Sequence, residues 1–127
     1  MELTPRHFAD TIVLSASGRV DHATSEMFKT ALLGQLGTCA AGQNPVVLDM
    51  GGIDYVASTG LRALMLASRQ VKAQGGVLVT AALQPVVLEV FEIARFTMLF
   101  KNFSSVRDAL AEISPEGLAA FEAAGGH

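Results

Sequence analysis

Three consecutive apolar residues at positions 46–48, Val-Val-Leu, constrain the fold of this chain more than any other feature. An apolar side chain at every position, rather than at alternate positions, is typical of a strand that is covered on both faces. A glycine-containing segment, which we expect to form a loop, follows at 49–57, and apolar residues then recur at helical spacing over 58–73. A strand that needs cover on both faces, followed by a helix, indicates an α/β fold.

The same alternation of strands and helices runs along the chain. Short apolar runs predict four strands, around residues 11–14, 46–48, 77–79 and 98–100. Helical periodicity and capping patterns predict four helices, over residues 23–36, 58–73, 85–94 and 105–113. The segment before the first strand contains Pro5 and can pair only as an edge strand or hairpin arm. Short connections predict right-handed crossovers, and hence a mixed, mostly parallel sheet of four to five strands with about four helices.

Composition excludes several classes of protein. A length of 127 residues suits a single domain. Half of the residues are hydrophobic, yet no uninterrupted apolar run approaches the ~18 residues of a membrane-spanning helix, and the N-terminus lacks a secretory signal pattern. Cys39 is the only cysteine, so no intrachain disulfide can form. A net charge of −3 with nine scattered basic residues argues against nucleic acid binding. We therefore expect a cytoplasmic protein that does not insert into the membrane.

Ser58, Thr59 and Gly60 lie at the start of the helix predicted over 58–73. The backbone N–H groups of a first helical turn are unpaired and the helix dipole is positive there, so such a position favours an anion. A phosphate group on Ser58 would therefore be compatible with the fold. Serine and threonine are also ordinary helix N-caps, which stabilise a helix by ~1 kcal/mol. Both roles can be served by the same residue.

Residues 49–62, Asp-Met-Gly-Gly-Ile-Asp-Tyr-Val-Ala-Ser-Thr-Gly-Leu-Arg, resemble the phosphorylation-site motif of STAS domains, above all that of the bacterial anti-sigma factor antagonists. Residues 18–26 are similar to the family's glycine–x–hydrophobic–Asp segment, which leads into the first helix. The resemblance implies a single STAS domain over residues 1–113. Residues 114–127 are then an extension, for which we expect a short helix over 116–123 and a loose end.

The resemblance implies a phosphorylation-switched binding protein rather than an enzyme. Ser58 is implied as the phosphoacceptor, in a loop with Ala57, Thr59 and Gly60. Ala57 departs from the family pattern, which often carries Asp before the acceptor serine. The unphosphorylated form would bind an anti-sigma factor that is also an ATP-dependent serine kinase. Phosphorylation would release this partner, and a metal-dependent serine phosphatase would reset the switch. The alternative is a cytoplasmic STAS subunit of a lipid or anion transport system of the ABC type.

Four residues are candidates for the partner surface. The resemblance places Asp21 near the acceptor serine, where it would help to engage a partner, although capping of the first helix is an equally good interpretation. At ~100° per residue, Arg62, Leu66 and Arg69 fall on the outer face of the helix over 58–73. A leucine between two arginines suits an interface, although single exposed leucines are also common.

The sequence lacks the common motifs of catalysis, nucleotide binding and metal binding. Val56 stands where a nucleophile elbow around Ser58 would require glycine, and no acid is placed to orient His22. Neither of the common glycine-rich phosphate-binding motifs is present. One cysteine and dispersed histidines do not have the spacing of a zinc site. We therefore expect no catalytic residues, no metal site and no cofactor.

Overall fold

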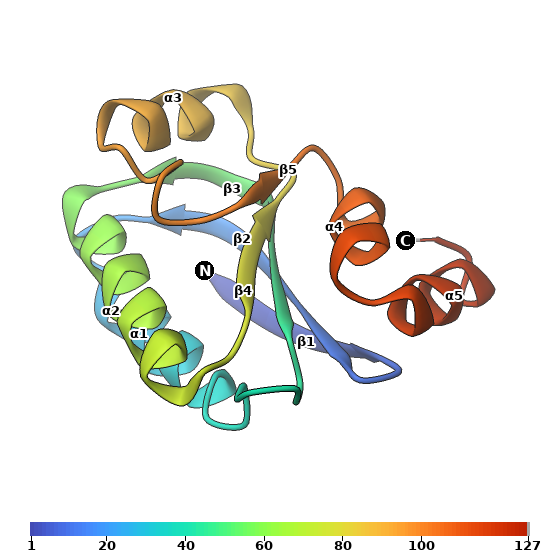
Figure 1. Cartoon of the computed structure of the whole chain (residues 1–127). Helices are drawn as coiled ribbons and strands as arrows, with labels where there is room; N and C mark the ends of the chain where they lie inside the picture. The colour runs from blue at the N-terminus through green and yellow to red at the C-terminus, as the bar shows by residue number, and fades with distance from the viewer. Residues whose placement is uncertain (127) are drawn as a thin grey trace.

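The computed structural model describes residues 1–126. Its elements, in chain order, are β1 (Glu2–Phe8), β2 (Thr11–Val20), α1 (Ser25–Gln35), β3 (Val46–Val56), α2 (Ser58–Gln74), β4 (Leu78–Ala81), α3 (Pro85–Ile93), β5 (Asn102–Phe103), α4 (Val106–Ile113) and α5 (Pro115–Ala123). Figure 1 shows a single domain with the helices packed around one sheet. His127, part of the end that was expected to be loose, lies outside the described residues.

The sheet has five strands in the order β1-β2-β3-β4-β5. β1 pairs antiparallel with β2, and the remaining neighbours pair in parallel. The mixed, mostly parallel sheet predicted from the sequence is therefore confirmed. Pro5 lies in β1, which is the outer strand and the first arm of a hairpin, as its missing N–H requires.

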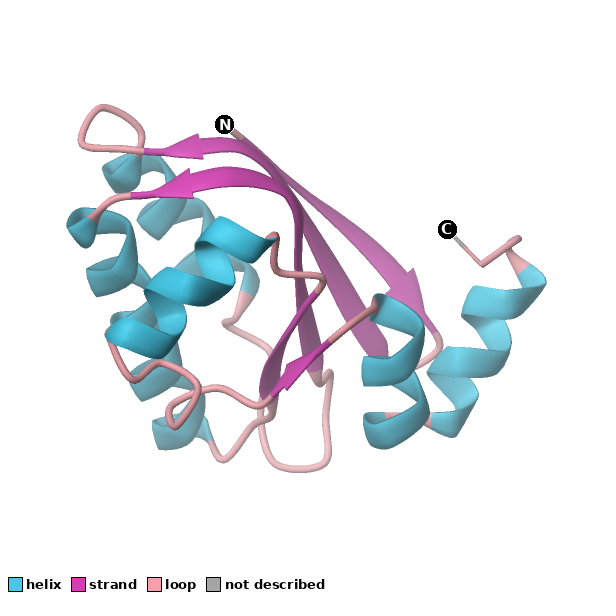
Figure 2. Cartoon of the chain, turned by 90° about the horizontal axis from the view of Figure 1, so that it is seen from above, coloured by secondary structure: helices cyan, strands magenta, loops and turns pink. Residues whose placement is uncertain are grey.

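Helices cover both faces of the sheet. Figure 2 shows α4 and α5 on the side opposite to the larger group of helices. Leu48 of β3 packs in one core with residues of α1, α2 and α3, whereas its neighbour Val47 packs in a second core with residues of α4 and α5. Successive side chains of a strand point to opposite faces, so an unbroken apolar run is what this position needs. The prediction that residues 46–48 are covered on both faces is confirmed.

Two of the expected strands differ in the structure. Residues 98–100 lie in turns after α3 instead of a strand, and Met98 is 82% exposed. The Phe100 ring contacts Phe91 and Phe96, with ring centroids 6.4 and 6.2 Å apart. Phe100 therefore reaches the core from a loop, and β5 begins two residues later. At β4, Val77 is 46% exposed and precedes the strand.

The C-terminal helix belongs to the second layer. α5 begins at Pro115, one residue before the expected start, and the Phe121 ring lies edge-on to Phe8 of β1 at 5.3 Å between centroids. Ser114 Oγ donates a hydrogen bond to Asp10 Oδ1 at 2.7 Å and accepts one from the Gly117 backbone N–H. The short helix predicted for the extension is thus present and packs against the sheet.

Candidate functional site

The candidate site lies where β2 and β3 end side by side. Val20 is paired with Val56, and the Ala57 backbone N–H donates a 2.7 Å hydrogen bond to the Val20 carbonyl. The helix α2 begins at the next residue, Ser58. Most of the loop expected over 49–57 is therefore strand, and Ala57 alone joins β3 to α2. Two hydrogen-bonded strands hold the serine in place.

Ser58 is the first residue of α2 and is exposed. Ala57 occupies the N-cap position, so no side chain caps this helix, and the first turn contains no acidic residue. Within residues 1–126, the Ser58 hydroxyl makes no side-chain hydrogen bond. The N-cap interpretation of Ser58 is therefore wrong. The hydroxyl is free to react beside unpaired backbone N–H groups, where a negative charge is stabilised.

Gly60 brings the start of α2 against the strand ends. A Cβ atom at this position would lie 2.6 Å from Val20 Cγ1 and 3.0 Å from Val56 Cγ1. A side chain here would therefore push the helix, and Ser58 with it, away from the sheet. The close approach of α2 to the ends of β2 and β3 therefore depends on this glycine.

Thr59 differs from its neighbour Ser58 in having a side-chain partner. Its Oγ1 lies 3.5 Å from His22 Nδ1, and the residue is only partly exposed. His22 thus approaches the start of α2 at Thr59. Of the two residues, Ser58 is the more exposed.

Asp21 shapes the loop between β2 and α1. Its Oδ1 accepts hydrogen bonds from the backbone N–H groups of Ala23 and Thr24, both at 3.0 Å. The Thr24 backbone N–H is the main cause that holds the pKa of the Asp21 carboxyl below its ordinary value. Arg19 Nε lies 3.9 Å from Asp21 Oδ2. The carboxylate thus closes the turn before α1.

A surface groove of about 540 Å³ begins at Ser58 and follows α2. Its lining residues are Ser58, Thr59, Leu61, Arg62, Met65, Leu66, Arg69 and Phe96. The structure therefore brings three of the four predicted partner-surface residues into one groove with Ser58, while Asp21 is not among the lining residues. Leu66 is half-buried rather than fully exposed and forms part of the groove wall.

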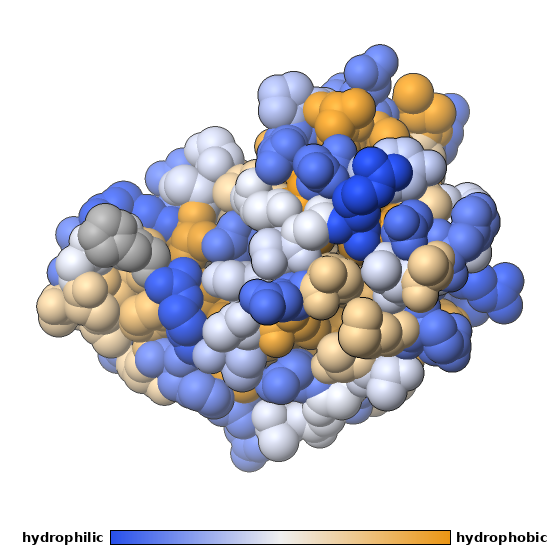
Figure 3. All heavy atoms as spheres, turned by 180° about the vertical axis from the view of Figure 1, so that it is seen from behind, coloured by the Kyte–Doolittle hydropathy of each residue, from blue (hydrophilic) through white to orange (hydrophobic). Residues whose placement is uncertain are grey.

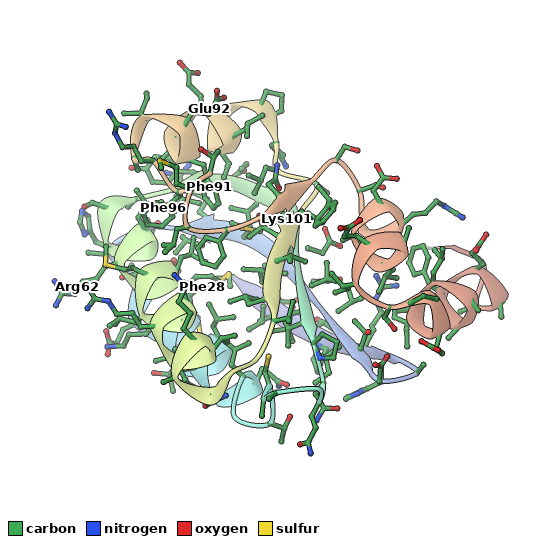
Figure 4. All side chains as sticks on the ribbon, viewed as in Figure 1. Phe28, Arg62, Phe91, Glu92, Phe96 and Lys101 are labelled. Atoms are coloured by element: carbon green, nitrogen blue, oxygen red, sulfur yellow. The ribbon has the colours of Figure 1, made fainter. Side chains whose placement is uncertain are left out.

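Phe96 is a lining residue from outside α2 that the sequence did not indicate. It lies in the turn after α3 and is 6% exposed, with its ring 5.5 Å from that of Phe91. Figure 4 shows Phe96 between α2 and α3, and Arg62 extending from α2 away from the body of the protein. No local pattern marks Phe96, because its position depends on how α3 packs beside α2.

Apolar side chains are also exposed on α3 and in the turn that follows it. Val86 and Ile93 of α3 and Met98 of the following turn are all more than half exposed. Seen from behind, hydrophobic residues also gather at the surface over α3 (Figure 3). The predicted helix over 85–94 is confirmed, but its apolar residues are only partly used in the core.

Neither a membrane-spanning helix nor a metal-binding cluster is found among residues 1–126. Within residues 1–126, no helix combines the length and the apolar character needed to cross a bilayer. The same residues contain no group of three or more His, Cys, Asp or Glu side chains that could hold a metal ion.

Comparisons with known proteins assign the family. Residues 2–109 match the STAS domain family. The chain is 36% identical over 111 residues, 87% of its length and 92% of the relative's, to a Bordetella bronchiseptica protein named "Putative anti-sigma factor antagonist BtrV". The chain therefore belongs to the STAS domain family, and its sequence relationship is to the anti-sigma factor antagonists. The family match does not test the boundary placed after residue 113, which stays a prediction.

Solved structures share the fold at low sequence identity. The anti-sigma factor antagonist SpoIIAA in its unphosphorylated form matches with a TM-score of 0.70 and 14% identity, over 88% of this chain and 96% of that one. SpoIIAA of Bacillus in the phosphorylated form matches with a TM-score of 0.62 and 14% identity, over 88% and 99%. The murine anion transporter Slc26a9 matches with a TM-score of 0.70 and 19% identity, over 84% of this chain but 18% of the transporter.

Proposed function

We propose that this protein is an anti-sigma factor antagonist whose partner binding is switched by phosphorylation of Ser58. One observation carries the proposal. In a chain that is 36% identical to a protein of that name, an exposed and uncapped serine begins α2, one residue after β3. SpoIIAA, which shares the fold, has been solved in phosphorylated and unphosphorylated forms.

The unphosphorylated protein binds an anti-sigma factor that is also a serine kinase. The kinase transfers the γ-phosphoryl group of ATP to Ser58 Oγ, the hydroxyl proton passes to a base on the kinase, and ADP is released. A metal-dependent serine phosphatase hydrolyses the phosphate ester and resets the switch. The protein itself acts by binding in the cytoplasm, without a catalytic residue, metal or cofactor.

Phosphorylation releases the partner because of the charge that it adds. A phosphate group carries roughly −1.5 to −2 charges at neutral pH. Burying such a charge in an interface without a dedicated partner costs several kcal/mol, and about 2.7 kcal/mol already changes affinity 100-fold. The domain itself tolerates the charge, because the phosphate lies at the start of α2, where unpaired N–H groups and the helix dipole favour an anion.

The partner surface surrounds the acceptor serine. Arg62, Leu66 and Arg69 line the groove that starts at Ser58. Asp21 contributes by holding the loop before α1 in shape. Ala57 is buried and donates its N–H to β2, so it supports the position of Ser58 rather than contacting the partner.

Phosphate transfer tests the acceptor. The protein is incubated with ATP and each serine-kinase anti-sigma factor encoded near it, and its intact mass is measured. We expect a gain of one phosphate in the wild type and in Thr59→Val, and no gain in Ser58→Ala. Transfer that persists in Ser58→Ala would assign the acceptor to another residue.

Partner affinity tests the switch. Ser58→Asp should keep its Tm within a few degrees of the wild type, because the helix start stabilises a negative charge by ~0.3–1 kcal/mol. Its affinity for the kinase should fall at least about tenfold, which corresponds to 1.4 kcal/mol. Equal binding by Ser58→Asp and the wild type would argue for a constitutively bound subunit of a transport system instead.

A further inference from the structure

The basic residues of the groove, Arg62 and Arg69, differ in their ion pairing from other basic residues of the chain. Four basic side chains elsewhere are paired with carboxylates, namely Arg19, Lys29, Lys101 and Arg107. Neither Arg62 nor Arg69 has an ion-pair partner within residues 1–126. The helix that carries them, α2, contains no aspartate or glutamate in its 17 residues. In a chain with net charge −3, this surface is therefore locally basic.

The two arginines flank an apolar strip. Leu66 and Met65 are half-buried on α2, and Phe96 lies beside them in the groove. Arg62 and Arg69 are seven residues apart, which corresponds to two turns and about 10 Å along a helix. A molecule that fills the groove must present apolar groups between two negative charges at about that spacing.

We propose that the groove receives an amphipathic helix of the partner, with carboxylates seven residues apart that pair with Arg62 and Arg69, and apolar side chains between them that contact Leu66 and Phe96. The inference rests on the proposed function and specifies the chemistry of the binding partner. Residues seven apart on a partner helix lie two turns apart, which matches the spacing of Arg62 and Arg69 on α2, and amphipathic helices commonly bind in apolar grooves. Arginine binds carboxylates through paired hydrogen bonds. Charge complementarity selects an acidic partner.

Arg62 links partner binding to phosphorylation in this proposal. Ser58 and Arg62 are four residues apart on one helix, and both line the groove. Side chains at this spacing are neighbours on the helix surface and form ion pairs. The phosphate on Ser58 takes Arg62 as its counter-ion, so the partner's first carboxylate loses its cation and faces the phosphate instead.

A measurement without any partner tests the pairing of Arg62 with the phosphate. Phosphoserine is incorporated at position 58 during synthesis, and the phosphate is titrated by ³¹P NMR in the wild type, Arg62→Gln and Lys72→Gln. We expect Arg62→Gln to raise the pKa of the phosphate by about 0.2–0.4 unit, the size of a helical ion pair. Lys72 is an exposed cation of the same helix outside the groove lining and serves as the control. Identical titrations of Arg62→Gln and Lys72→Gln would overturn the pairing.

Binding to the kinase identified by phosphate transfer tests the acidic helix. We expect Arg62→Gln and Arg69→Gln each to weaken binding about tenfold and to reduce its salt dependence, with Lys72→Gln within about twofold of the wild type. If all three variants bind like the wild type while phosphorylation still releases the partner, the acidic helix is wrong and the proposed function stands. If no kinase modifies Ser58, the proposed function fails, and the ³¹P titration still decides the role of Arg62.

Discussion

The two sides of the sheet differ in their helix caps, in their ion pairs and in the exposure of their apolar side chains. On the side of α4 and α5, Ser105 and Ser114 cap the helices through their hydroxyls. Two ion pairs lie on this side, between Arg107 and Glu122 at 2.8 Å and between Lys101 and Glu112 at 3.1 Å. On the side of α2 and α3, α2 starts without a side-chain cap, and the groove arginines have no ion pair among residues 1–126. Apolar residues such as Ile93 are exposed there.

We interpret the α4–α5 side as a surface that serves stability and the outer face of α2 as the proposed binding surface. Helix starts that are already capped and charges that are already ion-paired gain few further hydrogen bonds or ion pairs when a second molecule binds. Unpaired arginines beside half-buried apolar side chains gain both charge pairing and apolar burial when a partner docks. Substitutions on the α4–α5 side should therefore act on stability, and those on the outer face of α2 on binding.

The largest contrast is expected between two leucines of α2. Leu64 is completely buried, so Leu64→Ala should lower the free energy of unfolding by ~2–5 kcal/mol through lost transfer energy and the cavity that it leaves. Leu66 lies in the groove wall and is half-buried, so Leu66→Ala should cost about 1 kcal/mol or less in stability. Urea unfolding of both variants measures the two values. Equal losses would show that Leu66 belongs to the core and not to the groove.

Gly60→Ala should be the next most disruptive change. The added methyl group would meet Val20 and Val56 at distances that force the helix start to move, and overpacking of this kind costs ~1–3 kcal/mol. The displacement also moves Ser58, so phosphate transfer should slow in the fraction that remains folded. Gly34→Ala on α1 is the control, because a Cβ there meets nothing within 4 Å. Similar stability of the two variants would contradict the close packing at Gly60.

Serine-to-alanine changes at two helix starts compare the two sides directly. Ser114→Ala removes a buried hydroxyl that bonds both Asp10 and the start of α5, and should cost ~1–2 kcal/mol of stability. Ser58→Ala removes a hydroxyl that caps nothing and should leave stability within about 0.5 kcal/mol. Thermal unfolding of both variants is the measurement. A loss in Ser58→Ala as large as that in Ser114→Ala would mean that the serine of α2 is a structural cap.

The smallest effect is expected from the charge of Asp21. Its hydrogen bonds lower the pKa of the carboxyl in the folded protein, so the ionised form stabilises the fold above the pKa of the unfolded chain. That contribution is lost as the pH falls through the folded pKa. Wild type should therefore be more stable than Asp21→Asn at pH 7, and the difference should shrink as the pH falls below about 4. Urea unfolding at several pH values measures the difference, and a gap that widens in acid would reverse the assignment.

Local patterns account for much of the fold but not for all of its strands. Pro85 and Ser105 marked the starts of α3 and α4 because first-turn proline and hydroxyl caps act within a single turn. The short apolar run at residues 98–100 predicted a strand, but this prediction is wrong. A run of three apolar residues is too short to show a periodicity that would distinguish a strand from a buried loop. Packing of Phe100 on the rings of Phe91 and Phe96 decided its conformation.

The sequence by itself determined the alternation of strands and helices, the position of Ser58 at the start of α2, and the outward phase of Arg62 and Arg69. These features depend on residue type and spacing within a few turns, so they can be read locally. Only the tertiary structure decided that Phe96 completes the groove and that the two arginines form no ion pair with a carboxylate of residues 1–126. Such features depend on which distant segments packing brings together, and no local pattern encodes that choice.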